Sequence, residues 1–346
     1  MPMSGGKKER AMNIRDIARL ADVTPGTVSK VLNNYPDVGE ATRQHVLKII
    51  AENQYEPKGR GKKAEALPPR IGMVVESVYN PFYSEVEDSL SIHLHNAGYT
   101  LISFHDNFFA QNKREKFAEL LTGFQPEKLN GLIYIGGNFE EVTPEEFSQL
   151  PCPTIFVNTM LPYPTGKLLY SSVQVSQFAT AYAQMERLIG QGHRDICTII
   201  SSNIDTSVYS LRYRAYRAAL SQNGLEKNLA AFLETDYQFD KAYGAVLAHF
   251  RAHPETTAVC SGMDIVVPAV LRALHDAGRI PGKDVNILSF DGLPALKYCI
   301  PSISTYEQPT QDIVRFVFHL IDGLINKTQK HQHITCQPLF KQRESC

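Results

Sequence analysis

Three short helical patterns come first along the chain. Apolar residues at the spacing i, i+3, i+4 and i+7 predict a first helix on Ile14, Ile17, Ala18 and Ala21. The same spacing recurs on a second helix at 28–32 and on a third at 46–50. The stretch 57–70, PKGRGKKAEALPPR, then breaks the periodicity with prolines and glycines, and we interpret it as a linker.

From Ile71 onward, apolar runs alternate with amphipathic segments. The runs typical of strands are 71–77, 100–105, 131–137, 154–158, 196–201, 257–262 and 285–290. Helical periodicity lies near 82–96, 111–124, 177–190, 207–222, 240–252, 264–277 and 310–325. This βα alternation predicts parallel sheets covered by helices on both faces. There are too many units for one ordinary domain, so we expect two lobes, with a ligand between them at the carboxyl ends of the strands.

The first two helices and their tight turn, DIARLADVTPGTVSKVLNN at 16–34, have the helix-turn-helix arrangement. Asn13 is expected to cap the first helix and Thr24 the second, with Pro25 at a position that needs no N–H. The second helix is then predicted to lie in the major groove of DNA. A three-helix bundle that serves packing or partner binding is the alternative.

Charge supports a role in binding phosphates. Residues 1–63 hold 12 Lys and Arg against 7 Asp and Glu, a net charge of +5, whereas the whole chain has a net charge of −1. A basic head on an acidic body fits contact with nucleic acid.

Several function classes are disfavoured by the sequence. It has neither a membrane-spanning run nor a secretory signal, and its six cysteines are expected to be buried reduced thiols, so we expect a cytoplasmic protein. The phosphate-loop, dinucleotide, serine-hydrolase and HExxH motifs do not occur. We therefore expect no enzyme, no metal and no cofactor.

The residues resemble a known family. NIRDIARLADVTPGTVSKVLNN and VGEATRQHVLKIIAENQYEP are similar to the DNA-binding headpiece of the lactose/galactose repressor (LacI/GalR) family. RIGMVVESVYNPFYSEVEDSL, IGQGHRDICTII, AVCSGMD, RALHDAGRIPGKDVNILSFDG and the terminal RESC continue the resemblance through the rest of the chain.

This resemblance implies a fold, a set of domains and partners. The fold class is an all-α helix-turn-helix headpiece plus an α/β core like periplasmic binding proteins, with two doubly wound parallel-sheet lobes. The expected domains are a flexible leader (1–12), the headpiece (13–57), a basic hinge (58–70), an N-terminal lobe (71–158 and 292–328) and a C-terminal lobe (159–291 and 329–346). The chain would cross between lobes after Asn158, after Asp291 and near residue 330.

The implied function is a transcriptional regulator, usually a repressor in this family. It would be a homodimer, with a tetramer as the larger alternative, and two headpieces would read a pseudo-palindromic operator in double-stranded DNA. A small-molecule effector bound between the lobes would set operator affinity.

The hinge departs from the family pattern. The family places a leucine seven residues after the Tyr-x-Pro proline, where it kinks the minor groove, but this position is Ala64 here. Gly59 and Gly61 also disfavour the usual hinge helix. We hypothesise instead that Arg60 inserts into a narrow A·T minor groove while Lys62 and Lys63 contact phosphates. A solvated tether with non-specific phosphate contacts is the alternative.

Candidate DNA contacts follow from these arguments. They are Thr24, Pro25, Gly26, Thr27, Ser29, Lys30, Asn33, Tyr55, Lys58, Arg60, Lys62 and Lys63. Lys30 can donate to guanine O6 and N7, whereas Pro25 and Gly26 cannot hydrogen-bond a base. Asp22 takes the place of the glycine usual in the turn, and aspartate tolerates a positive φ better than most residues.

Candidate effector contacts are carried over from the resemblance by position. They are Glu76, Phe82, Tyr83, Asn158, Arg212, Asp264 and Asp291. Five of them have a purely structural alternative: a surface ion pair for Arg212, a turn or cap for Asp291, a helix cap for Asp264, a loop position for Asn158 and a structural role for Glu76. Met263 replaces an asparagine that the family usually has, which removes one polar contact.

The expected effector is a carbohydrate, with a nucleoside or a sugar phosphate as alternatives. Two rival functions stay open. One is an enzyme that acts on a sugar through the pocket carboxylates. The other is a carbohydrate-binding sensor module whose headpiece no longer binds DNA specifically, and the abnormal hinge is its motivation.

Overall fold

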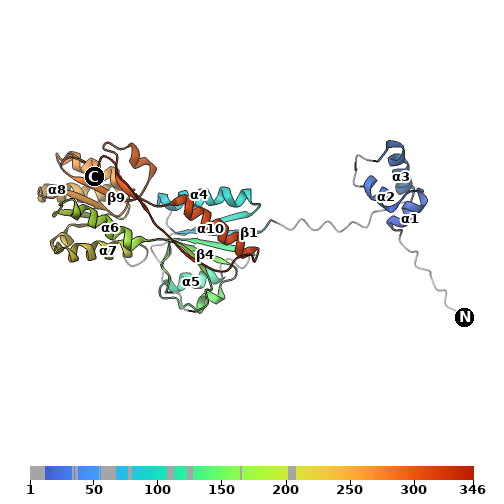
Figure 1. Cartoon of the computed structure of the whole chain (residues 1–346), viewed down its shortest axis with the longest axis horizontal. Helices are drawn as coiled ribbons and strands as arrows, with labels where there is room; N and C mark the ends of the chain where they lie inside the picture. The colour runs from blue at the N-terminus through green and yellow to red at the C-terminus, as the bar shows by residue number, and fades with distance from the viewer. Residues whose placement is uncertain are drawn as a thin grey trace. The chain divides into compact units, whose positions relative to one another are not determined.

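The computed structural model describes residues 12–32, 35, 38–53, 55, 68–76, 80–106, 113–122, 128–163, 166–201 and 208–346. The chain divides into two compact units, Met1–Leu67 and Pro68–Cys346, each with its own core (Figure 1). The expected leader, 1–12, lies outside the described residues except for Met12. No helix among the described residues is both long enough and apolar enough to cross a membrane.

The described part of the first unit contains three helices, α1 (Ile14–Leu20), α2 (Pro25–Leu32) and α3 (Glu40–Glu52). Both expected caps are confirmed. The side chain of Asn13 accepts from the backbone N–H groups of Arg15 and Asp16. The Asp16 carboxylate accepts in turn from the Asn13 N–H, which completes a capping box. The hydroxyl of Thr24 accepts from the Thr27 N–H at 3.1 Å, one residue before Pro25 begins α2.

These helices bury one small apolar cluster. Its buried members are Ile17, Ala18, Ala21, Val28, Val31, Val46 and Tyr55. The turn between α1 and α2 places Asp22 at a φ of 51°, so the positive φ that the sequence suggested is present. The cluster fixes α2 against α1 and α3 through one face of α2, so the opposite face is available for contact with another molecule.

The second unit is built on two six-stranded sheets, whose strand orders are β11-β5-β4-β3-β1-β2 and β12-β10-β9-β8-β6-β7. The first sheet contains β1 (Arg70–Glu76), β2 (Thr100–Asp106), β3 (Gly131–Ile135), β4 (Thr154–Val157), β5 (Ser171–Val175) and β11 (His333–Cys336). The second contains β6 (Ile196–Ile200), β7 (Phe232–Glu234), β8 (Ala258–Ser261), β9 (Asn286–Asp291), β10 (Ser304–Glu307) and β12 (Leu339–Lys341). All pairings are parallel except that of β12 with β10.

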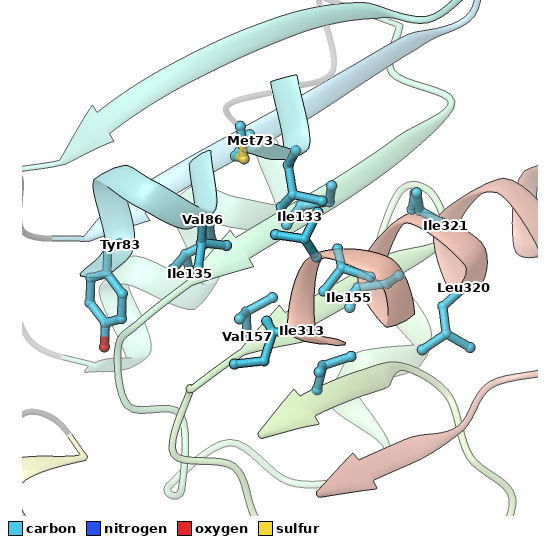
Figure 2. Close-up of a cluster of buried hydrophobic side chains, with 14 of the residues drawn as sticks. Met73, Tyr83, Val86, Ile133, Ile135, Ile155, Val157, Ile313, Leu320 and Ile321 are labelled. Atoms are coloured by element: carbon cyan, nitrogen blue, oxygen red, sulfur yellow. The ribbon is translucent and has the colours of Figure 1, made fainter. Parts of the chain in front are cut away.

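Helices cover both faces of each sheet, as the βα alternation predicted. The N-terminal lobe has α4 (Pro81–Asn96), α5 (Lys113–Thr122) and α10 (Thr310–Ile325). The C-terminal lobe has α6 (Gln177–Gly190), α7 (Tyr209–Gln222), α8 (Phe239–Ala252) and α9 (Val267–Asp276). Figure 2 shows how α4 and α10 bury Ile133 and Ile155 of the first sheet under Val86 and Ile321. Short 3₁₀ turns lie at Glu146–Gln149, Glu226–Ala231 and Pro294–Tyr298.

The crossings between lobes lie later along the chain than the sequence suggested. β5 pairs with β4 in the first sheet, so the first crossing follows Val175 rather than Asn158. β10 stays in the second sheet, so the second crossing follows Glu307 rather than Asp291. The third runs from Cys336 in β11 to Leu339 in β12, slightly after residue 330. The predicted lobe boundaries were wrong there because the sequences of β5 (SSVQV) and β10 (STYE) are too polar to resemble buried strands.

Candidate functional site

The outer face of α2 carries the candidate base contacts. Thr24, Pro25, Gly26 and Lys30 are exposed, whereas Val28 and Val31 on the opposite face are buried. Thr27 and Ser29 are half-buried, and the hydroxyls of Thr24 and Thr27 lie 2.9 Å apart. A Cβ added at Gly26 would meet only the Thr24 hydroxyl, at 3.6 Å, so packing does not require glycine there. The first turn of α2 therefore presents a low surface that can approach another molecule closely.

The remaining candidate DNA contacts are either buried in the headpiece or lie outside the described residues. Tyr55 packs into the headpiece core and is 8% exposed, which limits any contact it makes with DNA. Asn33, Lys58, Arg60, Lys62 and Lys63 lie outside the described residues, as does the Ala64 of the hinge.

In the core, Arg212 on α7 is buried beside Asp291 at the end of β9. Its Nη2 donates to Asp291 Oδ1 at 2.7 Å and its Nε donates to Gln177 Oε1 at 2.7 Å. Its Nη1 donates to the carbonyl of Gly262 after β8, and the guanidinium carbon lies 3.7 Å from the centre of the Phe290 ring. Burial lowers the pKa of Arg212, but the Asp291 carboxylate, together with Tyr209 and Tyr216, more than offsets this effect, so the net pKa lies above the usual value. Arg212 is thus no surface ion-pair residue.

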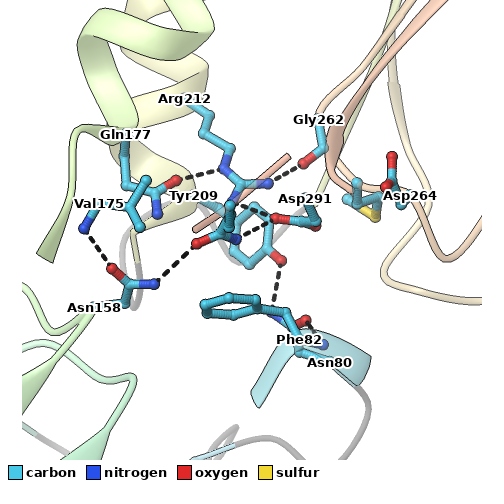
Figure 3. A network of polar contacts seen from close by, with 12 residues as sticks. Asn80, Phe82, Asn158, Val175, Gln177, Tyr209, Arg212, Gly262, Asp264 and Asp291 are labelled. Atoms are coloured by element: carbon cyan, nitrogen blue, oxygen red, sulfur yellow. Dashed lines mark hydrogen bonds and ion pairs between the residues drawn. The ribbon is translucent and has the colours of Figure 1, made fainter. Parts of the chain in front are cut away.

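A chain of side-chain amides extends this pair to the other lobe (Figure 3). Asn158 Oδ1 accepts from the Val175 N–H at 2.7 Å, so its Nδ2 faces Gln308 Oε1 at 3.1 Å. Gln308 Nε2 in turn donates to Asp291 Oδ1 at 2.7 Å. Because the backbone N–H can only donate, it fixes the orientation of both amides. Each amide therefore accepts through its oxygen and donates through its nitrogen to the next acceptor, and the chain of bonds ends at Asp291.

This network lies where the three crossings meet. Val175 and Gln177 flank the first crossing, and Gln308 belongs to the second. The third is joined to the first through the Ser176 N–H, which donates to the Cys336 carbonyl at 3.2 Å. Asn158 and Asp291 adopt φ angles of 47° and 117°, an unusual conformation for residues other than glycine. The local backbone strain therefore coincides with the residues that join the lobes.

Asp264 does not cap α9, whose N-cap residue is Val266. Its Oδ2 accepts instead from the N–H groups of Gly292 and Leu293, at 2.6 and 2.7 Å, and so holds the loop after β9. The residue is fully buried. Burial, together with the charge on Asp291, raises the pKa of Asp264 from 3.8 to about 7. Its carboxyl group therefore hydrogen-bonds the backbone next to Asp291 rather than facing a ligand.

The other candidates lie on the N-terminal lobe. Glu76 at the end of β1 is 3% exposed and accepts from the hydroxyl of Tyr134 at 2.5 Å. Gly137, at a φ of +81°, lies so close that a Cβ there would overlap the Glu76 carboxylate. Phe82 and Tyr83 at the start of α4 are also buried, and burial raises the pKa of Tyr83 well above its usual value. All three therefore contribute to the packing of this lobe.

The site also includes three residues that the sequence analysis did not identify as contacts. Gln177 and Gln308 complete the network, and Tyr209 on α7 receives a bond from Asn80 Nδ2 at 3.3 Å across the two lobes. Asn80 also caps α4 through the Phe82 N–H. An isolated glutamine carries no sequence pattern, so only the resemblance around Asn80 was a usable signal.

A helix-turn-helix unit followed by a two-lobed core of this kind defines the class of ligand-responsive DNA-binding regulators. Comparison with known proteins supports that class. The model for bacterial regulatory proteins of the lacI family matches residues 13–58, and that for the periplasmic binding protein-like domain matches residues 185–346.

Individual relatives match nearly the whole chain. The transcriptional regulator MalR of Clostridium butyricum is 31% identical over 337 residues, which cover 97% of this chain and 99% of that protein. The lac repressor dimer bound to operator and the anti-inducer ONPF has a TM-score of 0.67 at 18% identity, covering 97% of this chain and 99% of that one. The regulator CelR in complex with cellobiose has a TM-score of 0.64 at 22% identity, with coverages of 97% and 100%. The chain belongs to the LacI family and is a DNA-binding transcriptional regulator.

We predict that Gln308→Leu destabilises the second unit by about 2–4 kcal/mol, because the change leaves Asn158 Nδ2 without an acceptor and removes a donor from Asp291. Urea unfolding followed by circular dichroism measures this. Gln311→Leu, on the exposed first turn of α10, is the control and should stay within about 0.5 kcal/mol of wild type. Equal effects of the two substitutions would contradict the network.

We also predict that Asp264 makes stability depend on pH. Because its folded pKa of about 7 lies above the value of 3.8, the folded state holds a proton that the unfolded state has lost. Stability from this group is therefore complete below about pH 4 and is lost as the pH rises to about 7.

In wild type, the free energy of unfolding should decrease between pH 4 and pH 7. In Asp264→Asn, this decrease should be smaller by at least about 2 kcal/mol, because the titrating carboxyl is absent. Denaturant unfolding at several pH values measures the difference. Asp240→Asn, at an exposed position of α8, is the control and should leave the wild-type slope intact. A wild-type slope in Asp264→Asn would show that the carboxyl is ionised throughout.

Proposed function

We propose that this regulator binds a sugar between its two core lobes and that the sugar sets its affinity for a pseudo-palindromic operator. Asn158, Arg212 and Asp291 are the proposed polar contacts with the sugar, while Phe82 and Tyr83 supply apolar surface. Glu76 and Asp264 are proposed to support these residues through hydrogen bonds within each lobe, without contacting the sugar. Support for a sugar comes from the cellobiose complex of CelR, a protein of the same fold.

One observation carries the proposal. The buried Arg212–Asp291 pair lies in the same hydrogen-bonded network as all three crossings between the lobes. A ligand hydroxyl that bonds Asp291 or Arg212 must therefore share or replace bonds that hold the crossings. Pairing a guanidinium and a carboxylate with ligand hydroxyls is also the chemistry by which polar groups orient a sugar in a pocket.

The mechanism is thermodynamic linkage. Closure of the lobes on the sugar favours one arrangement of the crossings, and the arrangement of the crossings is coupled to the headpieces of a dimer. A sugar can shift operator affinity only by the ratio of its affinities for the two arrangements, typically about 1–3 kcal/mol.

On DNA, α2 is proposed to lie in the major groove with Thr27, Ser29 and Lys30 toward the bases. Pro25 and Gly26 would permit close approach, with Pro25 against a thymine methyl group. The arrangement is supported by the exposure of this face and by the operator complex of the lac repressor dimer, which has the same fold. Two headpieces in a homodimer would then read two half-sites.

Selection from a library of genomic duplexes, followed by anisotropy measurements on the recovered sequence, tests this function. We expect one pseudo-palindrome to be enriched and at least one of maltose, cellobiose and ribose to change its affinity at least about fivefold. Lys30→Ala should weaken the specific complex at least about fivefold, through the lost contact with guanine.

Lys48→Ala is the matched control, because Lys48 is an exposed lysine on α3 and lies outside α2. It should change specific affinity less than about twofold. Uniform recovery of the library would instead support the sensor module without specific DNA binding. Enrichment with no response to any sugar would overturn the effector class while leaving the DNA-binding role intact.

A further inference from the structure

A pocket of about 400 Å³ lies beside the first and third crossings of the core. Its walls come from residues 159–163 after β4, from strands β5 and β11, and from the first residues of α6. None of the seven residues that the sequence suggested as effector contacts lines it. Its volume falls within the range of about 300–1,000 Å³ that is usual for small-molecule sites. It touches both lobes, because β5 and β11 belong to one sheet and α6 covers the other.

Two residues that line this pocket carry an unpaired buried polar atom. Among the described residues, four buried side-chain nitrogen or oxygen atoms have no hydrogen-bond partner: Gln177 Nε2, Thr198 Oγ1, Ser289 Oγ and His333 Nε2. Two of them, on Gln177 and His333, belong to residues that line the pocket. A buried polar atom without a partner costs about 1–3 kcal/mol, so such atoms in native proteins call for an explanation.

The orientation of both groups follows from their other contacts. Arg212 can only donate, so Gln177 must turn its Oε1 to Arg212 Nε, which leaves Nε2 as the unpaired atom. Gln177 itself is 3% exposed. His333 places Nδ1 2.7 Å from the Ser172 hydroxyl, and its ring packs edge-on against Tyr170. Its second ring nitrogen is then the one that needs a partner.

The lining indicates the chemistry of a ligand. Three aromatic side chains, Tyr163, Tyr170 and Phe178, contribute ring surface. Among the described residues, the lining contains no lysine or arginine, and its one carboxylate is that of Glu140. Burial, together with His331, lowers the pKa of His333 and keeps the imidazole neutral at neutral pH. A phosphate or carboxylate would lack a cation here, whereas hydroxyls could bond Glu140 and the amides, and the rings could pack on an apolar face.

We propose that this pocket binds a second small neutral ligand with several hydroxyls, a sugar or a cyclic polyol. Tyr163 and Phe178 pack against the ligand, and a small shift of the Gln177 and His333 side chains, whose Nε2 atoms are buried in this structure, lets both nitrogens bond its hydroxyls. Because Gln177 Oε1 bonds Arg212, the ligand also holds the partner of the effector-site arginine in place. This coupling to the effector rests on the proposed function, but binding at the pocket does not.

Equilibrium dialysis of the full chain against radiolabelled glucose, maltose and myo-inositol tests the proposal by counting bound molecules. We expect at least one probe, or a mixture of two, to reach two molecules per chain. In the double variant Tyr163→Ala/Phe178→Ala, binding to one of the two sites should weaken at least about tenfold while the other is retained. Both side chains are at least 40% exposed, so the variant is expected to fold.

Phe239→Ala, at an aromatic residue of α8 that is 48% exposed and outside the pocket, is the control and should keep two sites. Asp291→Asn should weaken the other site and spare this one. Saturation at one molecule per chain or none with every probe would overturn the proposal. So would two undiminished sites in the double variant. If the second site is present but no sugar alters operator binding, the proposed effector is contradicted and the second site is not.

Discussion

The guanidinium group of Arg212 is buried, and a buried cation costs several kcal/mol unless its donors are met. Asp291, Gln177 and the Gly262 carbonyl meet them, and each comes from a different part of the chain. The ends of β8 and β9 and the start of α6 must therefore converge on one point. That convergence fixes the C-terminal ends of two parallel strands, where α/β proteins place their ligand sites.

The same requirement extends to the second lobe. Asp291 also accepts from Gln308, which in turn bonds Asn158 at the end of β4. The lobes are thus joined by polar contacts whose directions are fixed, rather than by apolar packing alone. Such contacts can be exchanged for bonds to a ligand, because hydroxyls can replace amides at little net cost when every group stays paired. In the proposed function, this exchange of bonds is what lets a ligand favour one arrangement of the lobes over another.

Much of this fold could be predicted from the sequence, and the failures have specific causes. The long helices α4 and α10 were recognised because many apolar residues repeat at helical spacing. β5, β7, β10, β11 and β12 were missed because they are short or carry polar residues such as Ser172 and Gln174. Missing β5 and β10 displaced two of the crossings.

The site was predictable to a different degree. Arg212, Asp291 and Asn158 were identified only through the family resemblance, and the structure brings them into one network. Gln177 and Gln308 have no distinguishing neighbours in the sequence, and their role arises only from the three-dimensional meeting of the crossings. Asp264 was read as a contact or a cap, yet it holds the backbone after β9, a role that depends on which loop folds over it.

A double-mutant cycle on Arg212 and Asp291 tests most directly whether this buried pair organises the core. Arg212→Met and Asp291→Asn are each expected to lower the unfolding free energy by about 3–5 kcal/mol, because each leaves a buried charge without its partner. The double variant is expected to lose at least about 2 kcal/mol less than the sum of the two. Additive losses would show that the two residues act independently and would contradict the account.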